Sequence, residues 1–285
     1  MKNNNFDPKK VIDFYTNVYD EDARLKKDRR HIVEFETKKT LLLEQIHPGS
    51  IVFDIGAGTG VWSEFILDNI KGVKVYAFDL VLEHVRKINA RLSEKPGFMG
   101  AYVLDILSVD KTLDYQKEFE KADVVMLAGP LYHIKEYTER QSALRHAMGF
   151  LNGSETSIII ADWLSGCNAA METILNHECC NKVSIGPYNM LCPDKDNMFA
   201  YSNERRMEVL GRTLGLQTVR HYALDGISRL VADKLESLSE EDFQKWLDIS
   251  LELATMDKFC DYSEHNSTVY CRIDFNAEEY ASQGE

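Results

Sequence analysis

The sequence lacks several features that mark other classes of protein. None of its 6 cysteines stands in a C-x-x-C pair, and the adjacent Cys179 and Cys180 are poorly placed to bond each other. We therefore expect reduced thiols and no metal site. The chain also has no Walker loop, H-E-x-x-H or G-x-S-x-G sequence, so phosphoryl transfer, zinc proteolysis and esterase chemistry have no support.

Positive charge is also scarce. The chain has 33 basic against 46 acidic residues, a net charge of -13, which opposes attraction to a phosphate backbone. We expect no nucleic-acid partner. No apolar run is long enough to span a bilayer, and the first ten residues lack the apolar core of a secretory signal. The sequence thus predicts a cytoplasmic protein without a membrane partner.

Short apolar runs alternate with amphipathic stretches from residue 51 onward. Strands are predicted at 51–55, 73–79, 99–106, 123–129, 157–163, 216–223 and 267–274. Helices are predicted at about 61–70, 82–92, 136–150 and 203–214, with a short one near Asp114. This order is typical of an α/β fold in which helices cover both faces of a doubly wound, mostly parallel, seven-stranded sheet.

Other segments surround this sheet. Residues 1–50 should form an N-terminal helical segment, with helices at about 8–18 and 31–46. Residues 51–285 should form the main domain, interrupted by two helical insertions at about 164–202 and 225–266. The second insertion contains Ser239 and Asp242 at the spacing of a capping box. No flexible linker or repeat separates these parts, so one packed domain is expected.

The loop Gly56-Ala57-Gly58-Thr59-Gly60 lies between a predicted strand and a predicted helix. Glycine permits a tight turn and a close approach of the backbone to a ligand. Asp79 ends the next strand, roughly 20 residues after Gly56, where a carboxylate can bind both ribose hydroxyls. Loop and acid together indicate a nucleotide-like ligand, and a dinucleotide-dependent oxidoreductase is one alternative.

Three details favour a different ligand from a dinucleotide. Val61 stands where G-x-G-x-x-G requires glycine, Asp54 precedes the loop, and Asp105 ends the third strand. The segment Val52 to Gly60, VFDIGAGTG, resembles motif I of class I S-adenosylmethionine-dependent methyltransferases. Asp79 in YAFDL and Asp105-Ile106 in YVLDI resemble their second and third motifs. This resemblance covers most of the chain and implies a Rossmann-like methyltransferase fold.

The resemblance also implies roles for the motif residues. The backbone at Gly56, Ala57 and Gly58 should approach the methionine end of S-adenosylmethionine, and Asp79 should hold its ribose. Leu80, Asp105 and Ile106 should contact the adenine. Asp54 should order the loop through hydrogen bonds. The helix that starts after Gly60 can favour the methionine carboxylate.

Residues 123–134, DVVMLAGPLYHI, resemble the fourth strand and loop of a bacterial subgroup of small-molecule methyltransferases that carry Gly-Pro-Leu-Tyr-His there. This adds Leu127, Ala128 and Tyr132 to the residues expected at the cofactor. The loop lacks the Asn/Asp-Pro-Pro-aromatic pattern of enzymes that methylate exocyclic amino groups of bases. A nucleic-acid acceptor is further disfavoured.

The stretch Glu21 to Glu36 resembles the region before motif I in that subgroup, where aromatic and basic residues close over the cofactor. Tyr15, Tyr19, Arg24 and Arg30 are candidates, and an arginine could pair with the methionine carboxylate. The alternative is a solvated helical surface with salt bridges between its side chains.

Two histidines are candidates for a general base. His133 follows the fourth strand, and the imidazole group can accept a proton near neutral pH. His265 stands before the last strand, where the subgroup has Ser-Asn-His and this chain reads Ser263-Glu264-His265. Either histidine could instead be satisfied by structural partners.

The predicted function is methyl transfer from S-adenosylmethionine to a small-molecule acceptor through an oxygen, nitrogen, sulfur or carbon nucleophile. Two alternatives stay open: a module that binds the cofactor without catalysis, and the oxidoreductase. A monomer or a homodimer is expected. The acceptor pocket should lie beneath the two insertions, since ligands of doubly wound sheets sit beyond the carboxyl ends of the strands.

Overall fold

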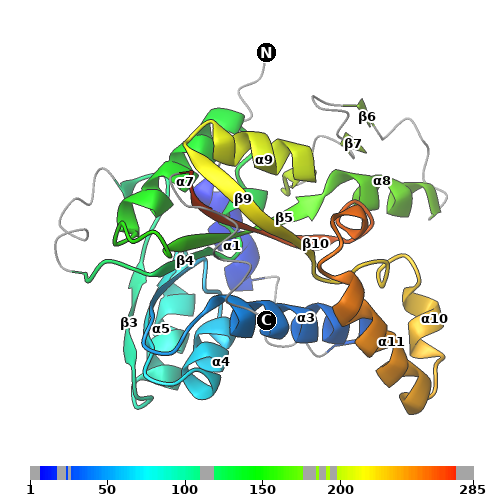
Figure 1. Cartoon of the computed structure of the whole chain (residues 1–285), viewed down its shortest axis with the longest axis horizontal. Helices are drawn as coiled ribbons and strands as arrows, with labels where there is room; N and C mark the ends of the chain where they lie inside the picture. Colours follow the sequence, from blue (N-terminus) through cyan, green and yellow to red (C-terminus); the bar gives the residue numbers. More distant parts are fainter. Residues whose placement is uncertain are drawn as a thin grey trace.

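A single twisted sheet organises the molecule (Figure 1). The computed structural model describes residues 7–17, 24, 27–109, 119–175, 184–185, 191–192 and 198–273. Seven strands lie in the order β3-β2-β1-β4-β5-β10-β9, and the short β8 pairs with β5 as an eighth. The strands of this sheet are β1 (Ile51–Ile55), β2 (Lys74–Asp79), β3 (Phe98–Val103), β4 (Val124–Leu127), β5 (Ile158–Ser165), β8 (Tyr201–Ser202), β9 (Leu216–Ala223) and β10 (His265–Arg272).

Strand direction confirms the predicted fold class. All neighbours in the sheet are parallel except β10, which runs antiparallel to both β5 and β9. The carboxyl ends of the five parallel strands β1 to β5 therefore point to one edge of the sheet. This is the edge where a doubly wound fold binds its ligands.

Helices cover both faces of the sheet. In Figure 1, α3, α4 and α5 lie below it and α7 and α9 lie above it. The helices are α1 (Pro8–Asn17), α3 (Arg29–Gln45), α4 (Val61–Asn69), α5 (Leu82–Leu92), α7 (Tyr137–Phe150), α8 (Gly166–Leu175), α9 (Glu204–Arg212), α10 (Ala232–Glu236) and α11 (Glu240–Leu253), with 3-10 turns η2 (Pro130–Tyr132) and η5 (Asp257–Phe259). A separate hairpin joins β6 (Ser184–Ile185) to β7 (Leu191–Cys192).

Alternate residues of each strand enter different cores. Phe53 and Ile55 of β1 pack with the residues of α7 and α9, whereas Val52 packs with Leu41 and Leu42 of α3. This period of two is what a strand buried on both faces requires. Burial of such side chains contributes roughly 1.5–3 kcal/mol each, which fixes the register of the strands that carry the loops.

The second insertion packs on the N-terminal helical segment. Phe243 and Leu247 of α11 are buried against Val33 of α3. Ser239 caps α11 by accepting a hydrogen bond from the backbone N–H of Asp242, as the sequence predicted. Arg29 extends the contact by donating to the carbonyl oxygens of Leu235 and Leu238 near α10. In Figure 1, α10 and α11 project at one end of α3.

The first insertion was predicted as helical over about 164–202 without bounds for any helix in it. In the structure, α8 begins as soon as β5 ends. Its first residues, Gly166 and Asn168, are poor helix formers, which hides it from a propensity argument. Ser165 compensates, because its Oγ accepts from the backbone N–H of Asn168 at 3.1 Å. The helix expected near Asp114 lies outside the described residues.

No helix in the described part of the chain is both long and apolar enough to cross a membrane.

Candidate functional site

The glycine loop adopts a conformation that only glycine tolerates well. Gly56, Gly58 and Gly60 have φ angles of 83°, 56° and 87°. The backbone N–H groups of Gly56 and Ala57 donate to the carbonyl oxygen of Phe78 at 2.8 and 3.0 Å. A Cβ atom at Gly56 would lie 2.7 Å from Cδ of Pro130. The loop is thus held between β2 and the turn after β4.

Asp79 completes the loop from the neighbouring strand. Its Oδ2 accepts from the Gly58 N–H at 2.8 Å, and its Oδ1 accepts from the Val81 N–H at 2.8 Å. His84 Nδ1 lies 3.2 Å from the same Oδ1. The carboxylate therefore fixes the glycine loop and the start of α5 at once.

Asp105 orders the next loop in a similar manner. Its Oδ1 accepts from the Leu107 N–H at 2.9 Å, and its Oδ2 accepts from Ser108 Oγ at 3.0 Å. Ile106 beside it is buried. Both acids end parallel strands and lie on the ligand-binding edge of the sheet.

A cavity opens over these residues at the ligand-binding edge of the sheet. Ten residues predicted for the site line it: Tyr15, Gly56, Gly58, Asp79, Leu80, Asp105, Ile106, Ala128, Tyr132 and His133. The lining residues that the sequence did not single out are Val11, Ile55, Val81, His84, Leu104, Gly129, Pro130 and Ile134. We refer to this space as the first cavity.

Asp54 lies behind the glycine loop rather than in the first cavity. It is buried, and its Oδ2 accepts from Ser63 Oγ at 2.7 Å, so its described contact is with α4. Oδ1 has no hydrogen-bond partner within the described residues. Burial raises the pKa of Asp54 to about 6. Ala57 and Leu127 are also buried and do not line the first cavity.

His133 stands at the wall of the first cavity with Tyr15. Its Nε2 lies 3.0 Å from the Tyr15 hydroxyl, and the two rings meet edge to face. Burial lowers the pKa of His133 to about 4. The imidazole is therefore neutral at pH 7, the form in which it can accept a proton.

The basic residues of the N-terminal segment have protein partners. Arg24 donates to both carboxylate oxygens of Glu34, at 2.6 and 3.0 Å. Arg30 lies 3.4 Å from Asp28 and 3.7 Å from Glu264. Neither arginine lines the first cavity. Tyr19 lies outside the described residues.

A second cavity of about 380 Å³ adjoins the first. The two share Ala128 and Tyr132 as lining residues. Lys38 of α3 and Asp162 of β5 form an ion pair in its wall, with 2.5 Å between Nζ and Oδ1. The full lining comprises Arg24, Glu34, Lys38, Trp62, Ala128, Tyr132, Asp162, Trp163, Leu224, His265 and Asn266.

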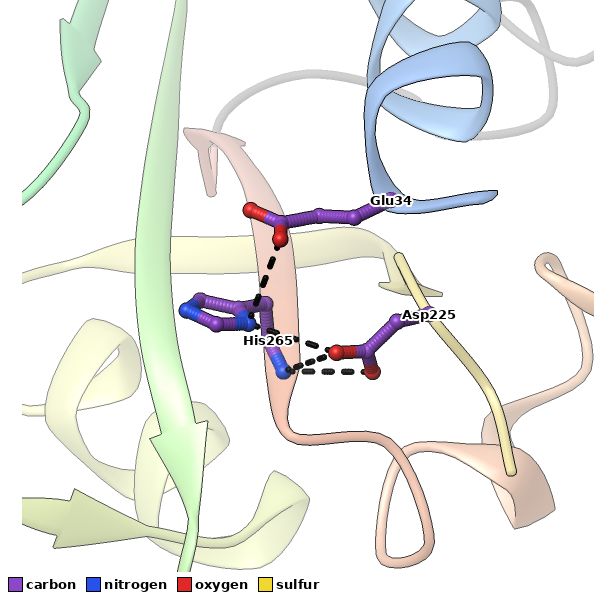
Figure 2. A group of neighbouring side chains, drawn as sticks. All are labelled: Glu34, Asp225 and His265. Atoms are coloured by element: carbon purple, nitrogen blue, oxygen red, sulfur yellow. Dashed lines mark hydrogen bonds and ion pairs between the residues drawn. The ribbon is translucent and has the colours of Figure 1, made fainter. Parts of the chain in front are cut away.

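His265 lies in this second cavity, apart from His133. Figure 2 shows its Nδ1 between the carboxylates of Glu34 and Asp225, at 3.6 and 3.3 Å. Burial alone would lower the pKa of His265, but the charges of Glu34 and Glu264 and the bond to Asp225 raise it to about 9. An imidazolium at neutral pH binds an anion better than it takes a proton.

The side chains of Glu34, Asp225 and His265 lie close enough to hold a metal ion, with one ligand atom from each within 4.8 Å of the others. Their bonds point to another arrangement. The Glu34 oxygen that faces His265 already accepts from Arg24, and Asp225 accepts from the backbone N–H of Glu264 at 2.7 Å. The protonated imidazole supplies the positive charge that the two carboxylates need.

Comparison with known proteins relates the chain to methyltransferases. Residues 35–148, which carry the glycine loop, Asp79, Asp105 and His133, match the model of the FtsJ-like methyltransferase family. The match covers less than half of the chain, and it supports a class I S-adenosylmethionine-dependent methyltransferase. The first cavity is where the matching motifs meet. Membership of a subgroup with Gly-Pro-Leu-Tyr-His stays a prediction.

Solved structures of methyltransferases share the fold of this chain. Magnesium protoporphyrin IX methyltransferase from Synechocystis PCC 6803, determined with bound S-adenosylhomocysteine, has a TM-score of 0.57 at 12% identity, over 93% of this chain and 100% of that one. The CcbJ methyltransferase from Streptomyces caelestis has a TM-score of 0.53 at 12% identity, over 92% and 96%. Protein PH0226 from Pyrococcus horikoshii OT3 has a TM-score of 0.52 at 14% identity, over 92% and 97%. The chain matches none of the curated proteins with which it was compared.

Three charged residues in or beside the second cavity, Glu34, Lys38 and Asp225, escaped the sequence analysis. Glu34 and Lys38 lie on α3 at the spacing of one helical turn, but a charged helix in an acidic protein also fits a solvated surface. Asp225 lies two residues after the end of β9, as Asp105 lies two residues after the end of β3. That shared position was the signal available for Asp225.

Proposed function

We propose that this methyltransferase transfers a methyl group from S-adenosylmethionine to a small-molecule acceptor. The observation that carries the proposal is the meeting of the two cavities at Ala128 and Tyr132. The first cavity has the motif residues of a cofactor site, and the second opens beside it over the carboxyl end of β5. A reaction between two bound molecules requires such adjoining sites.

The first cavity fits the cofactor in its own geometry. Gly56 avoids the clash that a Cβ would make with Pro130 and lines the cavity, as binding of the methionine end requires. Asp79 would hold the ribose hydroxyls, and Asp105 and Ile106 the adenine. S-adenosylmethionine supplies a methyl carbon on a sulfonium, so the acceptor atom bonds to that carbon while the C–S electron pair returns to sulfur.

The residues of the chain would position the acceptor and remove its proton. His133 is neutral at pH 7 and faces the first cavity beside Tyr132, so its Nε2 can accept a proton from an O–H or N–H acceptor. The hydroxyl oxygen of Tyr15 would then accept a hydrogen bond from the Nε2–H that forms. The buried surroundings exclude water from this step.

Calorimetry with S-adenosylhomocysteine and NAD tests the cofactor assignment. Saturable binding of S-adenosylhomocysteine and none of NAD is expected, and the reverse pattern would point to an oxidoreductase. A screen of small acceptors with S-adenosylmethionine, read by S-adenosylhomocysteine release, tests the transfer. Saturable cofactor binding with no methylated product from a broad screen would make the protein a non-catalytic binding module.

The acceptor is proposed to be small rather than a nucleic acid. The net charge of -13 opposes binding of phosphate backbones. Retention on RNA at physiological salt together with its methylation would contradict this part of the proposal.

A further inference from the structure

The carboxylate of Asp79 is largely occupied by the protein itself. Its Oδ1 accepts from the backbone N–H of Val81 at 2.8 Å and lies 3.2 Å from Nδ1 of His84, while its Oδ2 accepts from the Gly58 N–H at 2.8 Å. The two oxygens of a carboxylate together offer about four lone-pair sites. With both sites of Oδ1 filled, one site is left, on Oδ2. Asp79 can therefore accept one full hydrogen bond from a ribose rather than two.

His84 stands beside Asp79 as the third residue of α5. Both side chains are buried, with 6% of His84 and 9% of Asp79 exposed. A carboxylate accepts hydrogen bonds and does not donate them, so Nδ1 of His84 carries a proton and donates to Oδ1. Because the same oxygen also accepts from Val81 at the start of α5, the helix and the carboxylate together fix the place of the imidazole.

The distal nitrogen of His84, Nε2, is able to bond a ribose hydroxyl. Because an O–H group both donates and accepts, a hydroxyl can bond Nε2 whether or not that nitrogen carries a proton. His84 lines the first cavity together with Asp79. The ring of Tyr15 meets the His84 ring edge to face, with centroids 6.0 Å apart, and so packs against the imidazole from α1.

The other polar groups of the first cavity are placed differently. Asp105 follows the next strand, and both of its oxygens accept from the loop after it. Tyr15 and His133 bond each other. The two hydroxyls of a ribose stand on neighbouring carbon atoms, so the group that takes the second hydroxyl must adjoin Asp79. Among the described side chains of the first cavity, His84 is the one that bonds Asp79.

We propose that His84 is a cofactor-binding residue, which takes one ribose hydroxyl of S-adenosylmethionine on Nε2 while Oδ2 of Asp79 takes the other. This divides between two residues the contact that the proposed function gives to Asp79. The inference rests on that function, because it takes the first cavity as the cofactor site. A ligand that lacks either hydroxyl loses a contact with a different residue.

Calorimetry on the wild-type protein measures the two contacts one at a time. The probes are S-adenosylhomocysteine and its forms without the 2′ or the 3′ hydroxyl. Loss of the hydroxyl on the carboxylate should weaken binding about tenfold or more, and loss of the one on the imidazole about three- to tenfold, because bonds to charged groups are stronger. Two equal losses of tenfold or more, or full affinity of either deoxy form, would overturn the proposal. Failure of S-adenosylhomocysteine itself to bind would overturn the proposed function instead.

Substitution of His84 separates a direct contact from support of Asp79. His84→Asn places an amide near the position of Nδ1, so it can still donate to Asp79 but has no group at the position of Nε2. In this variant, one deoxy form should bind within about twofold of S-adenosylhomocysteine, and the loss for the other should persist. His47→Gln, at an exposed histidine outside both cavities, is the control and should keep both losses.

His84→Phe keeps the ring and removes both nitrogens. It should show the same pattern as His84→Asn, with weaker binding of all three ligands because Asp79 also loses a donor. Denaturant unfolding reports whether each variant is folded. A folded His84→Asn protein that keeps both losses would refute the contact, since His84 would then act through Asp79 alone. Should neither variant fold, the wild-type losses decide.

Discussion

The hydroxyl of Tyr15 lies 3.0 Å from Nε2 of His133, so a residue of the first helix contacts the loop after β4. This contact joins two segments that are 118 residues apart in sequence at the wall of the first cavity. It also places a proton donor or acceptor beside Nε2 of His133. The N-terminal helix is thereby part of the candidate site.

Replacement of His133 should impair transfer and not cofactor binding. For an acceptor that must lose a proton, His133→Asn is expected to lower the single-turnover rate by roughly 10²-fold or more at pH 7. The S-adenosylhomocysteine affinity should stay within about twofold. Tyr15→Phe, which keeps the ring and removes the hydroxyl, should have a smaller effect on the rate. Full turnover of His133→Asn would mean that His133 is not a general base and only lines the cavity.

Asp79→Ala should weaken S-adenosylhomocysteine binding by about tenfold to over a hundredfold, the equivalent of roughly 1.5–3 kcal/mol for lost charge-assisted bonds. Asp123→Ala is a matched control, since Asp123 also accepts a backbone N–H, from Ile51 at 2.8 Å, but lies at the opposite edge of the sheet. Calorimetry on both variants separates ligand binding from general loss of structure. Equal losses of affinity in the two would contradict the ribose assignment.

Gly56→Ala should abolish cofactor binding, because the added methyl would lie 2.7 Å from Pro130 and displace the loop. Gly153→Ala provides the comparison. Gly153 has φ 81°, close to the 83° of Gly56, but a Cβ there would meet nothing within 4 Å. Both variants carry the same backbone strain, on the order of 1 kcal/mol. Only Gly56→Ala should lose S-adenosylhomocysteine binding. If both variants keep this binding, the glycine loop can move enough to accommodate the added methyl group.

The free energy of unfolding should decrease as pH rises above about 6.5, because His265 loses its proton. Its pKa is about 9 in the folded protein against an ordinary 6.5, so its contribution is complete below about pH 6.5 and is lost as pH rises to 9. The slope is at most about 1.4 kcal/mol per pH unit. The charged groups around the ring are Glu34, Asp225, Glu264 and Arg24.

Denaturant unfolding of wild type, His265→Gln and His47→Gln between pH 6.5 and 9 measures this effect. The His265 variant should show a flatter dependence on pH than the other two proteins. A dependence unchanged by the His265 substitution would mean that the imidazole is not charged in the folded state.

Much of the fold followed from periodicity. The limits predicted for α5 and β9 coincide with the observed ones, because apolar residues recur there at the period of each element. Hydrophobic spacing placed a helical insertion at about 164–202 but could not give the bounds of α8, whose N-terminus depends on the Ser165 side chain. Of the candidate cofactor residues, those that end parallel strands, such as Asp79 and Asp105, could be placed by topology alone.

The second cavity could not be predicted from hydrophobic periodicity or from strand order. Its charged residues are Arg24, two residues of α3, one of β5 and His265 at the start of β10, and their contacts form only when the chain is folded. Arg24 resembled a ligand of the methionine carboxylate, yet Glu34 ten residues later binds it in the structure. Sequence spacing gives the faces of a helix but not which distant carboxylate an arginine will meet.

The place of β10 in the sheet bears on how the protein comes to fold. This strand enters between β5 and β9, and β9 has no other neighbour in the sheet order. During synthesis, both edges of β9 therefore stay unpaired until residues 265–272, which form β10, have left the ribosome. Since His265 begins that strand, a nascent chain can assemble the glycine loop and its acids well before the second cavity exists.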